Sequence, residues 1–158
     1  MIEAISPGMV MKCVVYEDGQ RFDDIDLEQI SHWLQRERAF VWLGLREANK
    51  ALLSKIQDEF GLHELAVEDA CSAHQRPKLE EYGDILFMVL HTAQLVEQGL
   101  EFGETHLFIG PRFLITVRHG ASASLSKVRE RCEALPHQLS KGSGFVLYSI
   151  MDYVVDNY

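Results

Sequence analysis

The most informative part of the sequence is GLHELAVEDA at residues 61–70, followed by HQRPK at 74–78 and ILFMVL at 85–90. The first run predicts a short helix with two adjacent acids, Glu68 and Asp69. Pro77 disfavours helical angles at the residue before it, so a helix cannot continue through this polar turn. The third run is short and apolar, as is typical of a buried strand. A helix, a turn and a core strand are therefore expected in succession.

The rest of the chain alternates between strand and helix patterns. Strands are predicted at Val10–Tyr16, Phe40–Leu45, Ile85–Val96, Glu101–Ile109 and Phe113–Arg118, with a strand-like pattern already from Lys78. Helices are predicted from Asp26, at about Asn49–Phe60 and at about 122–135. Hairpin bends are expected at Asp18-Gly19 and Gln98-Gly99. This order predicts one α/β domain over residues 1–158, a mixed β-sheet flanked by helices as an α/β/α sandwich.

Composition and charge restrict the function classes. The 158 residues are 47% apolar and 25% charged, which is ordinary for a globular domain. The net charge of −9 argues against a nucleic-acid partner, because such proteins need clustered Lys and Arg. It suits cations better, although most acidic proteins are simply soluble. The three cysteines lie far apart, which argues against a disulfide framework or a thiolate zinc site.

Neither an enzyme nor a membrane segment is indicated. No nucleophile–base–acid order stands out, and Gly142-Ser143-Gly144 lacks the Lys and the spacing of a phosphate-binding loop. The longest unbroken apolar run, Ile85–Leu90, is far shorter than the roughly 20 residues that cross a bilayer. We therefore expect a soluble domain without catalytic activity.

The last segment has no helix stop signal. Residues 143–158 follow a helical apolar pattern that includes Val146, Ile150 and Val154, and neither Gly, Pro nor a basic last turn ends it. The expectation is that this helix continues in a longer protein.

The acids of the short helix and of the last helix are candidate metal ligands. Glu68 and Asp69 could bind a divalent cation, which prefers carboxylate oxygens, or could simply pair with Arg76 or Lys78. Asp152 and Asp156 share one helix face, which could also be only the solvated side of that helix. His63 is expected to cap or pack at the start of its helix. The run His74, Gln75, Arg76 and Lys78 could bind an anion or hold a catalytic base, although a histidine in such a polar turn is more often a hydrogen-bonding anchor.

The 61–90 stretch resembles the signature of the cytoplasmic domain of the CorA family of magnesium and cobalt transporters. The resemblance extends from about Val41 onward, and the run Tyr148-Ser149-Ile150-Met151-Asp152 resembles the start of that family's long helix to the membrane. Two residues depart from the family pattern, Gly44 after Trp42 and Glu64 after His63. Neither departure falls on an expected ligand position.

The resemblance implies a regulatory domain that senses divalent cations at subunit interfaces. The implied ligands of the regulatory ion are Glu68, Asp69 and Asp152, with a further acid beyond Tyr158. The ion would be Mg2+, with Co2+ or Zn2+ as alternatives, and the whole protein would be a homopentamer in the cell inner membrane, with this domain on the cytoplasmic side. The alternatives are the zinc-transporting branch of the same superfamily and a stand-alone cytosolic interaction module.

Overall fold

The computed structural model describes residues 7–121 and 124–156 of the chain. Its centre is one seven-stranded sheet in the order β2-β1-β3-β7-β6-β5-β4. The strands are β1 (Val10–Glu17), β2 (Gln20–Asp24), β3 (Ala39–Arg46), β4 (Lys78–Tyr82), β5 (Ile85–Val96), β6 (Gly99–Ile109) and β7 (Phe113–Gly120). Neighbouring strands are antiparallel except β3 and β7, which are parallel, so the predicted mixed sheet is confirmed.

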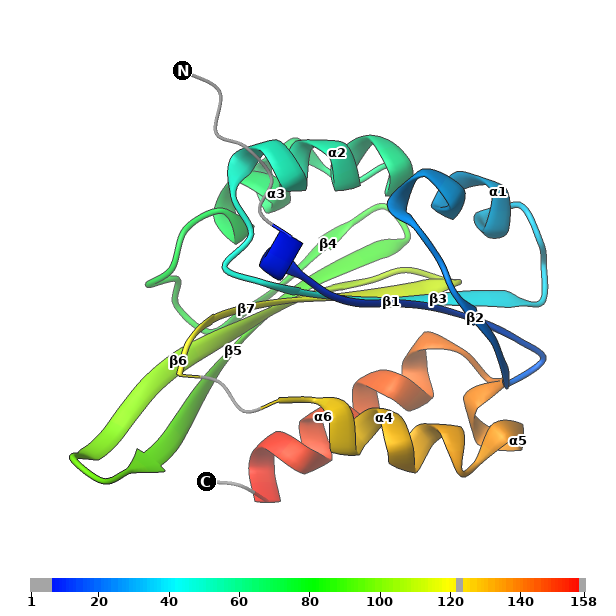
Figure 1. Ribbon diagram of the computed structural model, residues 1–158. Helices are drawn as coiled ribbons and strands as arrows, with labels where there is room; N and C mark the ends of the chain where they lie inside the picture. The colour runs from blue at the N-terminus through cyan, green and yellow to red at the C-terminus, as the bar shows by residue number, and fades with distance from the viewer. Residues whose placement is uncertain (1–6, 122–123, 157–158) are drawn as a thin grey trace.

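Helices cover both faces of this sheet (Figure 1). One face holds α1 (Ile30–Leu34), α2 (Lys50–Phe60) and α3 (Glu64–Ala70), and the other holds α4 (Ser126–Glu133), α5 (Pro136–Leu139) and α6 (Ser143–Asp156). Two 3-10 turns, η1 (Pro7–Met9) and η2 (Leu27–Gln29), precede β1 and α1. The predicted three-layer sandwich is therefore confirmed.

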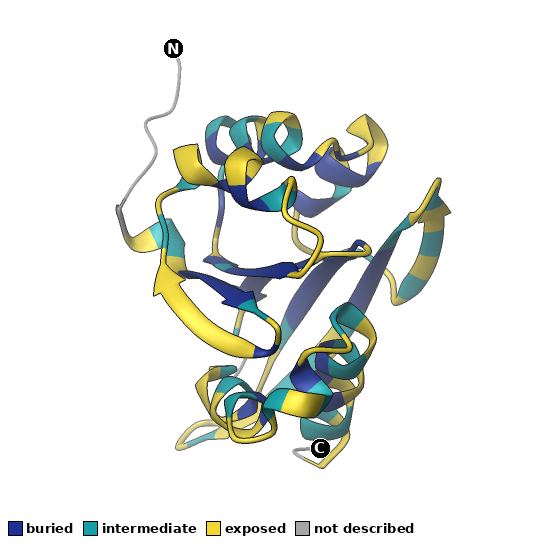
Figure 2. Ribbon diagram, turned by 90° about the vertical axis from the view of Figure 1, so that its right-hand side faces the viewer, coloured by how far each residue is buried: buried dark blue, intermediate teal, exposed yellow. Residues whose placement is uncertain are grey.

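Each face of the sheet has its own apolar core, because successive side chains of a strand point to opposite faces. In β3, Val41 and Leu43 pack under α1–α3, whereas Phe40 and Trp42 pack over α4–α6. Figure 2 shows that the central strands are almost entirely buried while the helices expose their outer sides. This double burial explains why β3 has a nearly continuous apolar sequence.

The ends of α2 follow from its flanking residues. Asn49 Oδ1 accepts a hydrogen bond from the backbone N–H of Leu52 at 3.0 Å, which satisfies one unpaired donor of the first turn. Gly61 ends the helix in the left-handed conformation with φ at +69°, which costs glycine little. The predicted bounds of this helix are confirmed to within one residue.

Two boundaries differ from the sequence expectation. The strand-like pattern from Lys78 is divided into β4 and β5 by a tight hairpin at Gly83, whose φ is +64°. The helix expected at about 122–135 begins at Ser126 and ends at Glu133, since Pro136 starts a separate short helix; residues 122–123 lie outside the described part.

The last helix begins at Ser143 as predicted and is described as far as Asp156, with residues 157–158 outside the description. Among the described helices, none combines the length and the apolar character needed to cross a membrane.

Candidate metal centre

The short acidic helix α3 is fixed by its first residue. His63 Nδ1 accepts a hydrogen bond from the N–H of Leu65 at 3.1 Å, and its ring stacks on Tyr82 with centroids 4.3 Å apart. An imidazole therefore caps the helix, as the sequence suggested, and ties it to β4. Ala66, Val67 and Ala70 are buried against the core, which turns the other side of the helix toward solvent.

The two acids of α3 have different surroundings. Glu68 is exposed, whereas Asp69 is half-buried, and its Oδ2 lies 2.5 Å from Nζ of Lys78. The same ammonium lies 2.8 Å from Oε1 of Glu80. Hydrogen bonds to Asp69 and then to Glu80 raise the pKa of Lys78. Lys78, rather than Arg76, is therefore the cation that compensates the carboxylate at the end of this helix.

Asp152 lies in α6, at the edge of the face that packs on the sheet. Val146, Ser149 and Ile150 of this helix are buried, and Asp152 is half-exposed. Its Oδ2 lies 3.5 Å from Nη2 of Arg131 in α4. Asp152 thus takes part in a packed pair of helices, while Asp156 is exposed.

One copy of the chain does not bring these acids together. Glu68 and Asp69 lie in the helical layer on one face of the sheet, and Asp152 lies in the layer on the other face (Figure 1). Within residues 7–121 and 124–156, no three His, Cys, Asp or Glu side chains are grouped so that they could hold a metal ion. The three ligands remain a prediction, which requires a site shared between copies.

A buried polar network that the sequence reasoning missed holds the turn after α3. Glu104 of β6 accepts hydrogen bonds from the backbone N–H of His74 and, at 2.9 Å, from that of Gln75. His74 has a φ of +71°, which is uncommon for a residue other than glycine. The turn is therefore anchored through the backbone of His74, and Glu104 supports its unusual conformation.

Two histidines complete this network. His106 Nε2 lies 3.0 Å from Oε1 of Glu104, and His119 Nε2 lies 2.9 Å from the carbonyl oxygen of Ala70. Burial raises the pKa of Glu104, but the hydrogen bonds from His106, His74 and Gln75 outweigh this effect and hold it below the usual range. Burial also lowers the pKa of His106, so its neutral form is favoured. The network thus connects α3, the turn, β6 and β7.

The chain is similar to a known protein family and to individual proteins. The model of the family described as CorA-like Mg2+ transporter protein matches residues 37–158. YfjQ of Bacillus subtilis (strain 168), named for metal ion transport, is 33% identical over 150 residues, which are 95% of this chain and 46% of YfjQ. The cobalt/magnesium transport protein CorA of Thermotoga maritima is 25% identical over 146 residues, 90% of this chain and 41% of that protein. The chain spans less than half the length of both relatives.

Solved structures share the fold at lower identity. Full-length CmaX superposes with a TM-score of 0.75 at 20% identity, over 98% of this chain and 47% of that one. The soluble domain of CorA from Methanocaldococcus jannaschii superposes with a TM-score of 0.67 at 16% identity, over 95% of this chain and 58% of that one. The ZntB cytoplasmic domain from Vibrio parahaemolyticus superposes with a TM-score of 0.65 at 12% identity, over 95% of this chain and 59% of that one. These likenesses establish the fold.

Proposed function

The chain belongs to the family of CorA-like Mg2+ transporter proteins, and from this membership we propose that it is the cytoplasmic regulatory domain of a magnesium and cobalt transporter. The observation that supports this most is the family match over residues 37–158. The described activity of the family is transport rather than catalysis. The role proposed for this domain is to sense Mg2+ at the interfaces between subunits of a homopentamer in the cell inner membrane.

The positions of the acids are compatible with a shared site. Glu68 and Asp69 lie on one side of the domain and Asp152 on the other, so a head-to-tail contact brings α3 of one copy against α6 of the next. Such heterologous contacts close into a ring when the rotation between copies allows it. In the proposed ring, each interface then receives the acids of α3 from one copy and Asp152 from its neighbour.

Sensing follows from competition between cations. Asp69 and Asp152 are paired with Lys78 and Arg131, and both acids are partly accessible to solvent. A divalent ion that bridges two copies binds only the assembled state, so it shifts the equilibrium toward closure. When Mg2+ is scarce, unscreened carboxylates on adjacent copies repel one another and the closed state is disfavoured.

The coding sequence after Tyr158 provides the first test. We expect a long charged helix and then two apolar segments, with Gly-Met-Asn beside or between them. An open reading frame that ends within a few codons of Tyr158 would instead support a stand-alone interaction module with the same fold.

The second candidate, a zinc-transporting branch, is favoured by one observation, the fold that the chain shares with the ZntB cytoplasmic domain. Uptake of Mg2+, Co2+ and Zn2+ by the whole protein in metal-depleted cells separates the two candidates. Uptake of Mg2+ and Co2+ with little Zn2+ supports the main proposal, and Zn2+ uptake alone contradicts it.

A further inference from the structure

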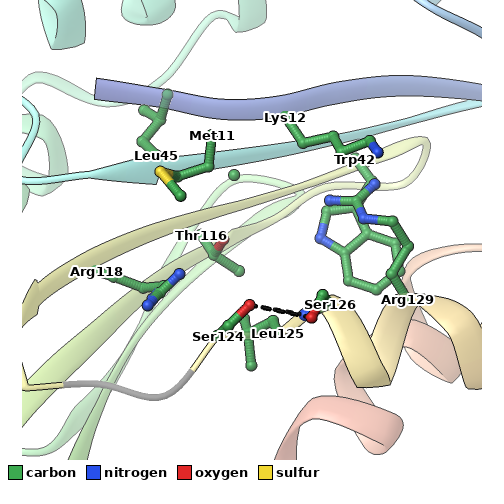
Figure 3. Close-up of a pocket in the computed structure, with 11 residues that line it drawn as sticks. Met11, Lys12, Trp42, Leu45, Thr116, Arg118, Ser124, Leu125, Ser126 and Arg129 are labelled. Carbon is green, nitrogen blue, oxygen red and sulfur yellow. Dashed lines mark hydrogen bonds between the residues drawn. The ribbon is translucent and has the colours of Figure 1, made fainter. Parts of the chain in front are cut away.

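A small pocket lies on the face of the sheet covered by α4–α6, near the carboxyl ends of the parallel strands β3 and β7 (Figure 3). Its volume is about 170 Å³. Eleven residues line it, among them Lys12, Trp42, Gly44, Thr116, Arg118 and Arg129. The carboxyl end of parallel strands beside the start of a helix is a common position for ligands in α/β proteins.

Three cationic side chains from different elements line this pocket. Lys12 comes from β1, Arg118 from β7 and Arg129 from α4, and none of the eleven lining residues is acidic. In the described part of the chain, neither Lys12 nor Arg129 forms an ion pair. A chain with a net charge of −9 therefore concentrates positive charge in one small cavity.

Two of these cations are held in place before any ligand binds. The guanidinium of Arg129 lies over the ring of Trp42 at 4.4 Å, and its Nη1 donates a hydrogen bond to the hydroxyl of Tyr16 at 3.4 Å. Arg118 is only 8% exposed. Burial and the neighbouring Arg46 lower the pKa of Arg118.

The start of α4 adds weaker donors to the same place. Its N-cap residue, Leu125, provides no side-chain hydrogen bond to the first turn, and the backbone N–H of Ser126 donates to Oγ of Ser124 at 3.2 Å. Ser124 and Ser126 place hydroxyl groups at the pocket wall, 3.2 Å from one another. The backbone dipoles of a helix start favour an anion, although this effect is secondary to the three cations.

Gly44 lines the pocket and has no side chain that could fill it. A Cβ at Gly44 would lie 3.6 Å from Oγ1 of Thr116 and 4.0 Å from Nη2 of Arg129, which are ordinary contact distances. Strand pairing places Gly44 between Lys12 and Thr116. A larger residue is therefore sterically acceptable at this position but would occupy the space between the basic groups.

We propose that this pocket binds a phosphate group. Three cationic side chains and three hydroxyl-bearing residues line the pocket. This set matches a doubly charged tetrahedral anion with several oxygens better than it matches a single carboxylate. The volume is below the roughly 300–1,000 Å³ typical of pockets for drug-sized ligands, so the ligand is inorganic phosphate or one phosphoryl group of a larger molecule. This site is separate from the predicted metal ligands.

Titration of the 15N-labelled chain with inorganic phosphate tests the proposal directly. The chain has two tryptophans, and only Trp42 lines the pocket, since Trp33 lies in α1 on the opposite face. The indole N–H signal of Trp42 should shift with a dissociation constant of about 1 mM or below, while that of Trp33 stays unchanged. Chloride at the same ionic strength should not reproduce the shift. An unmoved Trp42 signal, or equal effects of chloride, overturns the proposal.

Two cations of α4 form a matched pair for mutagenesis. Arg129 lines the pocket, whereas Lys127 is exposed and does not. Arg129→Gln should weaken phosphate binding about tenfold or more, because it removes a charge-assisted hydrogen bond, while Lys127→Gln should change it less than about threefold. Equal weakening by both variants means that phosphate is attracted by general surface charge, and the proposal fails.

Gly44→Asp keeps the test decisive if Arg129→Gln does not fold. The new carboxylate takes the place of the anion, so the thermal midpoint of this variant should no longer rise with phosphate as that of the wild type does. An undiminished phosphate response in Gly44→Asp contradicts the assignment. A parallel titration with glycerol phosphate distinguishes free phosphate from a phosphoryl group of a larger molecule. Tighter binding of glycerol phosphate than of inorganic phosphate indicates the phosphoryl group of a larger molecule.

Discussion

Lys78 Nζ lies 2.5 Å from Oδ2 of Asp69, so a carboxylate of the predicted metal site is already paired with a cation of its own chain. The two side chains are 27% and 32% exposed, which leaves the pair open to solvent and to exchange. A pair of this kind contributes at most about 1 kcal/mol to stability. Its more important consequence is that any divalent ion at Asp69 must compete with the ammonium.

Lys78→Gln should therefore make the protein more sensitive to Mg2+. Removing the competing charge leaves Asp69 with more negative potential, so less Mg2+ should half-protect the cytoplasmic part of the whole transporter from protease. We expect the midpoint to fall by roughly twofold to fivefold, which corresponds to ~0.4–1 kcal/mol. Lys55→Gln is the matched control, because Lys55 forms a similar 2.5 Å pair with Glu28 away from the predicted site. If Lys78→Gln instead raised the Mg2+ concentration needed for half-protection, Lys78 would position Asp69 for metal binding rather than compete with the metal.

The isolated chain should bind Mg2+ only weakly. One copy offers Glu68 and Asp69 in one layer and Asp152 in another, and Mg2+ needs several oxygens in a near-octahedral arrangement. Calorimetry on the 158-residue chain should show no binding tighter than about 1 mM. Tight binding of one ion per monomer would contradict the shared site.

Much of the fold could be predicted from local sequence patterns. The apolar run of β3 and the stripe of α2 follow directly from burial on one or both sides, and Asn49 and Gly61 mark helix ends by their own chemistry. The hairpin at Gly83 was missed because a strand-like pattern continues on both sides of it. The parallel pairing of β3 with β7 joins distant segments, and no local pattern reports it.

The sites were less predictable, because they depend on strand register. Glu104 and His106 alternate along β6 as polar residues of an exposed face would, yet both are buried, and the backbone of the 74–75 turn donates hydrogen bonds to Glu104. In the same way, Lys12 lies far from Arg118 in the sequence, and the order of the sheet and the packing of α4 bring both residues to one pocket with Arg129. The acids of α3 were identified from their chemistry and by resemblance, and among residues 7–121 and 124–156 no third His, Cys, Asp or Glu is grouped with them to hold a metal ion.

His106 should make the stability of the chain depend on pH below neutrality. Burial lowers its pKa in the folded state, so the unfolded state binds more protons as the pH falls below about 6.5. The stability that neutral His106 contributes is complete above that pH and is lost as the pH falls toward the lower folded pKa. Urea unfolding at pH 8 and pH 5 should show a smaller loss of stability on acidification for His106→Gln than for the wild type.

The same variant should be about 1–3 kcal/mol less stable at pH 8, because it alters the hydrogen bond to the buried Glu104. His137→Gln is the control, since His137 is exposed, and it should retain the pH dependence of the wild type. An unchanged pH dependence in His106→Gln would show that another group titrates.

Substitution of the individual acids determines which of them belong to the predicted metal site. In the whole transporter, Asp69→Asn and Glu68→Gln should each raise the Mg2+ concentration that half-protects the cytoplasmic part from protease, because cation affinity depends on the number of carboxylates. We expect an increase of roughly threefold to tenfold, which corresponds to ~0.7–1.4 kcal/mol. Glu64→Gln is the control: this acid lies in the first turn of the same helix and is not a predicted ligand. Asp152→Asn should act in the same direction if Mg2+ displaces Arg131 from it, and should have no effect if the 3.5 Å pair with Arg131 is its only role. If Asp152→Asn left the protective Mg2+ concentration at its wild-type value while Asp69→Asn raised it, Asp152 would not be a ligand. The acids of α3 would then be the only predicted ligands of the site among the tested residues of this chain.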